Sequence, residues 1–297
     1  MSAIEVGSRP GEVPSSLGRS PLLEIEDLRI SITSDGSSFE VVKGVALTVC
    51  ENEIVCLVGE SGCGKSMTAL SVMGLLPRGI AKVTSGRIDL EGRNLLSLQK
   101  RELRRLRAES ISMIFQDPIT SLDPVFTIGS VLEEVIRSHR NISRAEAREI
   151  AVGALVEAEL PDAADRLDSY PHQLSGGMRK RLQLASVLST GPNILLMDEP
   201  FGPLDAQTRT LIEDDFLKLW SEAGMTVMFV THDLAEAIAM CTRVVIITAR
   251  PGKVKSEYDI NLPSELSTTD RRMAPGYQDL FTSIWADLRE EVGTQLG

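Results

Sequence analysis

Short apolar runs alternate with helical patterns along most of the chain. Runs that are apolar throughout occur at residues 54–58, 194–197, 227–230 and 244–247, and apolar and polar residues alternate at 23–26 and 45–49. Short, fully apolar runs are typical of strands buried on both faces of a sheet. Residues 65–76 instead have apolar positions near helical spacing, and Pro77 follows them. Buried strands that alternate with helices predict an α/β fold with a mostly parallel core sheet.

The same pattern predicts how the chain is divided. Residues 1–21 are polar and rich in Ser, Gly and Pro, so we expect a flexible leader there. A domain over 22–255 follows, and the mainly helical stretch at about 97–175, with one strand-like segment at 111–115, is expected to be a helical subdomain inserted into it. The tail at 256–297 is predicted to contain a helix, because Leu280, Phe281, Ile284, Trp285 and Leu288 have helical spacing.

Composition and charge narrow the function. The chain has 297 residues, of which 42% are hydrophobic and 25% charged, and 31 Lys plus Arg against 42 Asp plus Glu give a net charge of -11. An acidic chain is repelled by a phosphate backbone, so we expect no nucleic-acid partner. The basic residues at 100–107 are therefore interpreted as a solvated helix face. No apolar run approaches the ~20 residues of a membrane span, and the spacing of Cys50, Cys56, Cys63 and Cys241 predicts free thiols on the cytosolic side.

The segment from Gly59 to Ser66 reads G-E-S-G-C-G-K-S and lies between a predicted strand and a predicted helix. In this pattern the glycines let backbone N–H groups surround phosphate oxygens, and the following helix directs its positive end at the same charge. Lys65 is then expected to reach the β- and γ-phosphates, and the Ser66 hydroxyl to bind Mg²⁺. The residues that we expect to contact ATP here are Gly59, Ser61, Gly62, Cys63, Gly64, Lys65, Ser66 and Met67.

A second group of site residues follows the apolar run at 194–197. Asp198 and Glu199 come next in the chain. We expect Asp198 to hold Mg²⁺ through its water shell and Glu199 to orient and deprotonate an attacking water. An apolar run followed by Asp-Glu is a weak signal alone, but it is strong beside a phosphate-binding loop.

The segment Ser175-Gly176-Gly177 precedes another predicted helix and resembles the signature motif of ATP-binding cassette (ABC) ATPases. A hydroxyl, two glycine amides and a helix N-terminus form a second anion site. The resemblance covers about residues 22–255. It implies a P-loop NTPase of the ABC type, in which a mostly parallel core sheet carries an antiparallel β subdomain and an inserted helical subdomain. It also implies that Ser175, Gly176 and Gly177 contact the γ-phosphate bound by the other subunit of a dimer.

Three further residues match motifs of this family. Gln116 resembles the Q-loop glutamine, which binds Mg²⁺ and senses the membrane subunits, and Asp205 resembles the D-loop aspartate, which communicates between the two ATP sites. His232 resembles the switch histidine that contacts the γ-phosphate and acts with Glu199 in hydrolysis. The implied metal donors are thus Ser66, Gln116 and Asp198.

The resemblance implies partners as well as chemistry. We expect an ATPase subunit that pairs with a second ATPase subunit, identical or paralogous, and drives separate membrane permease subunits of an importer at the cytoplasmic face of the inner or plasma membrane. A substrate-binding protein is expected as an indirect partner. The stretch from Gly59 to Met178 resembles the dipeptide, oligopeptide and nickel branch, whereas residues 201–209 and 249–252 resemble the nitrate, sulfonate and taurine branch. The absence of a cysteine-containing C-terminal extension favours the second branch, and a soluble ABC ATPase without a transport role is the alternative.

Two positions depart from the family pattern or carry separate chemistry. The position where the family stacks adenine on an aromatic ring holds Ile32, and Phe39 is the nearest aromatic candidate. Cys63 lies inside the phosphate-binding loop, so we expect thiol-alkylating reagents to inactivate the enzyme and a Cys63→Ser variant to resist them.

Overall fold

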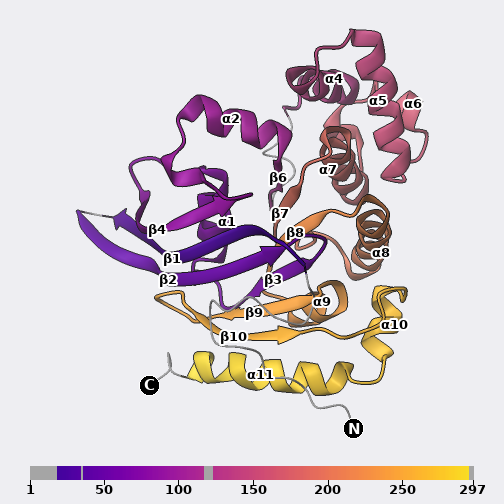
Figure 1. The fold of residues 1–297 in the computed structure, drawn as a ribbon. Coiled ribbons are helices and arrows are strands. Elements are labelled where there is room, and N and C mark those ends of the chain that lie inside the picture. The colour runs from indigo at the N-terminus through magenta and orange to yellow at the C-terminus, as the bar shows by residue number, and fades with distance from the viewer. Residues whose placement is uncertain (1–18, 35, 117–122, 294–297) are drawn as a thin grey trace. The chain divides into compact units, whose positions relative to one another are not determined.

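The computed structural model describes residues 19–34, 36–116 and 123–293 of the chain (Figure 1). These residues belong to two compact units, one formed by the described residues up to 103 together with those from 226 onwards, and the other by the described residues of 104–225. Nearly all of the expected leader lies outside the described residues, and its last residue, Pro21, already begins a strand.

The first unit contains a four-stranded antiparallel sheet in the order β2-β1-β4-β5. Its strands are β1 (Pro21–Ser34), β2 (Ser37–Cys50), β4 (Ala81–Leu90) and β5 (Arg93–Asn94). The tight connection between Ser34 and Ser37 aligns β1 and β2 over almost their full length. The two strands are therefore longer than the alternating segments at 23–26 and 45–49 indicate, and they form the expected antiparallel β subdomain.

The first unit also holds parallel strands that are buried along their whole length. β3 (Ile54–Val58) pairs in parallel with β8 (Thr226–Thr231) on one side and with β9 (Arg243–Ile247) on the other. β10 (Val254–Asp259) adds an antiparallel edge to β9 and crosses the domain end that the sequence places at residue 255. Every residue of β3, β8 and β9 is buried, which explains why these runs are apolar without alternation.

The helices of the first unit follow these strands. They are α1 (Lys65–Met73), α9 (Leu234–Met240), α10 (Thr268–Met273) and α11 (Tyr277–Gly293), with the 3-10 helix η1 (Leu95–Ser97) after β5. α1 ends at Met73 rather than at the predicted residue 76, because Gly74 adopts a left-handed conformation with φ of 59° and its N–H caps the helix. α2 (Lys100–Glu109) carries the exposed basic residues and spans the boundary between the units.

The predicted tail helix is α11, which lies along β10 (Figure 1). Lys255 of β10 pairs with Glu290 at 2.9 Å and with Glu291 at 3.1 Å. The hydroxyl of Tyr258 donates to Asp287 at 2.7 Å. These contacts fix the polar side of α11, and Leu280 and Ile284 bury its apolar side.

The second unit combines two parallel strands with a group of helices. β6 (Ile111–Ile114), predicted at 111–115, pairs with β7 (Ile194–Asp198). The helices are α4 (Ile128–His139), α5 (Arg144–Glu157), α6 (Ala163–Arg166), α7 (Gly176–Thr190) and α8 (Ala206–Ala223), with the 3-10 helix η2 (Pro171–Gln173) before α7. α5 packs on both α4 and α7, burying Leu132, Ile136 and Leu155. None of the helices in the described part of the chain has the length and apolar character needed to cross a bilayer.

Candidate nucleotide-binding site

The phosphate-binding loop connects the buried strand β3 to the first turn of α1, as the sequence predicts. Its glycines are required by close packing. A Cβ atom on Gly59 would lie 2.5 Å from the carbonyl oxygen of Ile247, and one on Gly64 would lie 2.6 Å from Cγ2 of Val42. Gly64 also has a φ of 97°, which side chains rarely allow. The neighbouring strands β9 and β2 therefore restrict the loop to one conformation.

Lys65 is folded onto this loop. Its Nζ donates to the carbonyl oxygens of Gly59 at 2.7 Å and Glu60 at 2.8 Å, and the residue is 5% exposed. The ammonium group is thus held at the centre of the loop, where it adds positive charge to the N-terminus of α1. Ser66 and Met67 occupy the first turn of the helix and are half-buried, whereas Ser61 and Gly62 are exposed at the tip of the loop.

Cys63 differs from the sequence-based expectation. Its side chain is 1% exposed, and its Sγ lies 3.7 Å from Nζ of Lys65. Burial raises the pKa of the Cys63 thiol, and the nearby Lys65 ammonium only partly opposes this shift. Alkylation requires an accessible thiolate. The expected sensitivity to alkylating reagents is therefore corrected: this thiol is inside the loop's packing, not on its surface.

In the second unit, the ends of β6 and β7 bring two predicted residues together. Nε2 of Gln116, just after β6, donates to Oε2 of Glu199 at 2.8 Å. Asp198 is the last residue of β7 and is 9% exposed, and Glu199 follows it with a φ of 44°. A non-glycine residue in this region is strained, and such strain is found where the surrounding structure fixes a side chain for function. The carboxylate of Glu199 is thus oriented by the amide of Gln116.

The signature segment and the predicted D-loop are also neighbours in the second unit. Ser175 caps α7, since its hydroxyl accepts from the N–H of Met178 at 3.3 Å. A Cβ on Gly177 would lie 2.9 Å from Cγ2 of Thr208, near the start of α8. Asp205 caps α8 by accepting from the Thr208 N–H at 3.0 Å, and this bond lowers the pKa of the Asp205 carboxyl. One contact network thus joins Gly177, Thr208 and Asp205.

His232 lies directly after β8 and is exposed. The residues on either side of it are fixed. The hydroxyl of Thr231 bonds to Glu236, and the carboxylate of Asp233 accepts from the N–H groups of Ala235 and Glu236 at the start of α9. The histidine therefore projects from a rigid strand–helix connection, a suitable place for a side chain that contacts a ligand.

Ile32 and Phe39 lie at the hairpin end of β1 and β2, next to the connection between Ser34 and Ser37. They are paired across β1 and β2, and Phe39 is 52% exposed. Two residues later, Cγ1 of Val41 is 3.5 Å from where a Cβ on Gly64 would lie, so this part of β2 reaches the phosphate-binding loop. The strand that carries the aromatic candidate therefore also contacts the phosphate-binding loop.

The donor chemistry of the predicted metal ligands suits Mg²⁺. The Ser66 hydroxyl, the Gln116 amide and the Asp198 carboxylate supply hard oxygen atoms, the donors that this ion prefers. Within the described ranges, no cluster of three or more His, Cys, Asp or Glu side chains is arranged to hold a metal by itself.

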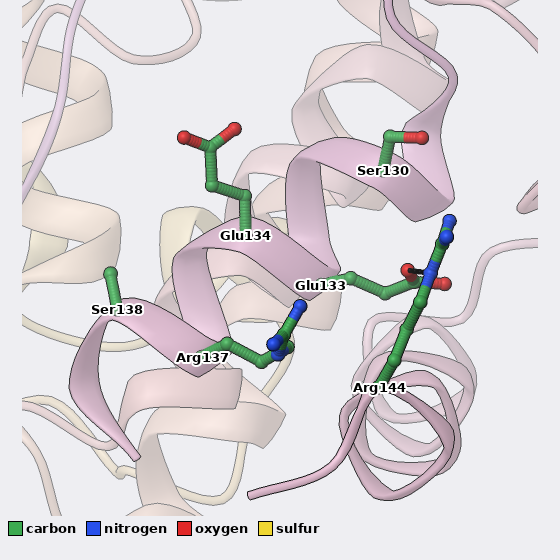
Figure 2. A pocket seen from close by; sticks show the side chains of 6 residues that line it. All are labelled: Ser130, Glu133, Glu134, Arg137, Ser138 and Arg144. Atoms are coloured by element: carbon green, nitrogen blue, oxygen red, sulfur yellow. Dashed lines mark hydrogen bonds and ion pairs between the residues drawn. The ribbon is translucent and has the colours of Figure 1, made fainter. Parts of the chain in front are cut away.

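Sequence reasoning did not assign two features of the structure. A turn at residues 248–253 packs against the phosphate-binding loop, and the only sequence signal for it is the Arg-Pro-Gly at 250–252. A cavity of about 370 Å³ also lies beside α4 (Figure 2), and it is lined by Ser130, Glu133, Glu134, Arg137, Ser138 and Arg144. The buried carboxylate of Glu133 pairs there with Arg144 at 2.6 Å. Figure 2 shows Arg137 on the same side of α4 as this pair.

Comparison with known proteins shows similarity over most of the chain. The family model described as ABC transporter matches residues 42–202. Over 228 residues the chain is 42% identical to the Probable peptide ABC transporter ATP-binding protein y4tR of Sinorhizobium fredii, covering 77% of this chain and 68% of that protein. It is 40% identical to the Dipeptide transport ATP-binding protein DppD of Bacillus subtilis, with the same two coverages. A dimeric post-hydrolysis structure of the ATP-binding cassette MJ0796 bound to ADP and Pi is similar with a TM-score of 0.71 and 28% identity, over 81% of this chain and 99% of that one. This likeness confirms the predicted fold class.

Proposed function

Since the chain belongs to the ABC transporter family, in which it is an ATP-binding and ATP-hydrolysing subunit, we propose that it powers an importer through separate membrane permease subunits. The observation that carries the hydrolytic part is the 2.8 Å bond from Gln116 to Glu199, because it orients a carboxylate directly after Asp198. The proposed place of the protein is the cytoplasmic face of the membrane.

The proposed roles follow from the local geometry. The loop from Gly59 to Ser66 binds the phosphates through its backbone N–H groups, and Lys65 neutralises their charge. Bound Mg²⁺ would be held by Ser66 and Gln116 and, through its water shell, by Asp198, and it would supply charge neutralisation at the β- and γ-phosphates. Glu199 accepts the proton of the attacking water, and Gln116 holds the carboxylate in position before the reaction. His232 stabilises the γ-phosphate.

We propose a dimer in which each subunit completes the other's site. Ser175, Gly176 and Gly177 are presented at the N-terminus of α7, a position that favours an anion. Gly177 packs closely against Thr208, and the N–H of Thr208 donates a hydrogen bond to Asp205. A phosphate bound at the signature segment would therefore affect the position of the D-loop. This network offers a route by which one ATP site reports to the other.

The proposed cargo is a peptide. The relatives described above carry peptide and dipeptide transport in their names, and another, the Oligopeptide transport ATP-binding protein OppD of Salmonella typhimurium, is 40% identical over 232 residues. The preference for the nitrate, sulfonate and taurine branch, which rested on residues 201–209 and 249–252, is not supported by these relatives and is corrected. Local similarity in two short segments was outweighed by identity over most of the chain.

For the permease-facing surface we propose the side of α4 and α5 that carries the cavity of Figure 2. Glu133 and Arg144 are already paired there, but the Arg144 side chain is 71% exposed and Arg137 is also exposed. Two exposed guanidinium groups beside a cavity suit carboxylates of a partner segment. The surface belongs to the helical part that follows Gln116, where the family resemblance implies coupling.

The proposed function is tested by affinity purification of the tagged chain from its native membranes, with mass spectrometry of the bound proteins. Recovery of a multi-span permease supports the importer. Recovery with no membrane partner would favour the soluble ABC ATPase instead. An Arg144→Glu variant is expected to lose the permease, whereas Arg101→Glu, an exposed change on α2, is the matched control and retains it.

Hydrolysis is tested separately with Glu199→Gln. We expect this variant to bind ATP, to trap a closed dimer and to hydrolyse ATP about 10²–10⁴-fold more slowly than the wild type. Turnover near the wild-type rate would remove Glu199 from the role of general base.

A further inference from the structure

The turn at residues 248–253 is hydrogen-bonded to β2 and packs against the phosphate-binding loop. The N–H of Gly252 donates to the carbonyl oxygen of Val41 at 2.8 Å, and the N–H of Lys43 donates to the carbonyl oxygen of Gly252 at 2.9 Å. A Cβ on Gly252 would lie 2.0 Å from the carbonyl oxygen of Cys63. Only glycine fits at this contact, so the backbone of the turn is in direct contact with the loop.

The inside of the turn is equally fixed. The hydroxyl of Thr248 donates to the carbonyl oxygen of Pro251 at 2.8 Å and accepts from the N–H of Lys253 at 3.0 Å. At the tip, Arg250 has a φ of 20°, a conformation that is costly for a residue with a side chain. The surrounding contacts therefore fix the backbone of Arg250 and the direction of its Cα–Cβ bond.

The Arg250 guanidinium lies over Gly62 of the phosphate-binding loop. A Cβ on Gly62 would be 3.4 Å from Nη2 of Arg250, 3.8 Å from Nε and 4.0 Å from Cζ, and no other atom outside its neighbours in the chain lies within 4 Å. Gly62 itself has a φ of 80°. A residue 188 positions further along the chain thus places a cation on the exposed tip of the loop.

Among the described residues, no carboxylate neutralises this guanidinium. In the part of the chain that the structure describes, Arg250 has no carboxylate partner and no hydrogen bond. Lys65, the other cation of the loop, is instead occupied by the carbonyl oxygens of Gly59 and Glu60. An unpaired guanidinium beside exposed backbone N–H groups is a strong binding partner for phosphate, since its planar fork matches phosphate oxygens.

We propose that Arg250 is a further nucleotide-binding residue, which contacts the phosphate chain of the bound nucleotide from the turn at 248–253. The inference rests on the proposed function, because it takes the loop from Gly59 to Ser66 as the phosphate site. It assigns a binding role to the Arg-Pro-Gly segment. The rigid turn keeps the side chain in position before the nucleotide arrives, which reduces the entropic cost of binding.

The test measures the affinity of the full chain for fluorescent ADP and ATP analogues with Mg²⁺, over a range of salt concentrations. The variants are Arg250→Gln and Arg250→Lys, and the matched control is Lys253→Gln, which removes an exposed cation from the same turn. We expect Arg250→Gln to raise Kd about ten-fold and to weaken its salt dependence, with partial rescue in Arg250→Lys. Lys253→Gln is expected to behave as the wild type.

Two results would overturn the inference. One is a Kd for Arg250→Gln within about two-fold of the wild type. The other is an equal loss in both Arg250 variants together with a lowered melting temperature of the nucleotide-free protein, which would mean that Arg250 only supports the fold. If the wild-type chain bound neither nucleotide, the proposed function itself would fail, and the two failures are therefore distinguishable.

Discussion

Ile32 of β1 and Phe39 of β2 face each other across the antiparallel pair at the hairpin end of these two strands. Directly opposed residues share one face of a sheet, with Cβ atoms about 4.5–5.5 Å apart. The ring of Phe39 therefore lies beside the Ile32 side chain on the same face of the sheet. β1 has no aromatic residue at position 32, but its partner β2 provides the exposed ring of Phe39 next to that position.

The first prediction concerns this pair. Stacking of a base on an aromatic side chain contributes about 1–3 kcal/mol, so Phe39→Ala should weaken ATP binding about ten-fold in Kd. The measurement is nucleotide titration by fluorescence. The double variant Ile32→Phe with Phe39→Ala returns an aromatic ring to the same patch and is expected to recover most of the affinity. An unchanged Kd in Phe39→Ala would place the adenine elsewhere.

Because Gly177 packs closely against Thr208, the effect of Gly177→Ala on the melting temperature should change sign when Thr208 is also replaced. Replacing Gly177 by alanine gains about 1 kcal/mol of helix propensity but forces a Cβ to within 2.9 Å of Thr208 Cγ2, an overpacking that costs about 1–3 kcal/mol. Gly177→Ala should therefore lower the melting temperature. In a Thr208→Ser background, which removes Cγ2, the same alanine should raise it. Lowered stability in both backgrounds would show that the contact is not the cause.

Cys63 provides a prediction about reactivity. Because its thiol is buried and its pKa is raised, N-ethylmaleimide should modify it slowly in the native protein and rapidly after unfolding in urea. All four cysteines are free and buried, so a thiol-reactive dye should count them only in denaturant. The measurement is mass spectrometry of labelled peptides over time. Fast native labelling of Cys63, with loss of ATPase activity, would restore the expectation that the structure corrects.

Tyr258 anchors the tail helix and predicts a pH effect. Burial first, and then the bond to Asp287, raise its pKa from 10.0 to about 12. A raised pKa means that the stabilisation is complete below the unfolded value of 10.0 and is lost as pH rises towards about 12. Ultraviolet titration of tyrosinate should show a late step that Tyr258→Phe removes and Asp287→Asn shifts to lower pH. A tyrosinate step that is unchanged in Asp287→Asn would exclude Asp287 as a cause.

The sequence predicted the fold class, the buried strands and the helix starts because these depend on local patterns. β3, β7, β8 and β9 are buried along their whole length, so their apolar runs are unbroken, and Ser175 precedes a helix as a capping residue does. Helix ends were less accurate, since the left-handed Gly74 ends α1 before Pro77 does. The assigned roles of the site residues remain predictions that the variants above test.

What the sequence by itself determined is which residue types lie at the ends of which strands, because short motifs such as Gly59 to Ser66 carry their own backbone chemistry. The tertiary structure alone decided which distant residues meet. It paired Ile32 with Phe39, buried Cys63, bonded Gln116 to Glu199 and placed Arg250 over Gly62. Such contacts depend on strand register and backbone packing between segments far apart in the chain, and a local pattern contains no information about either.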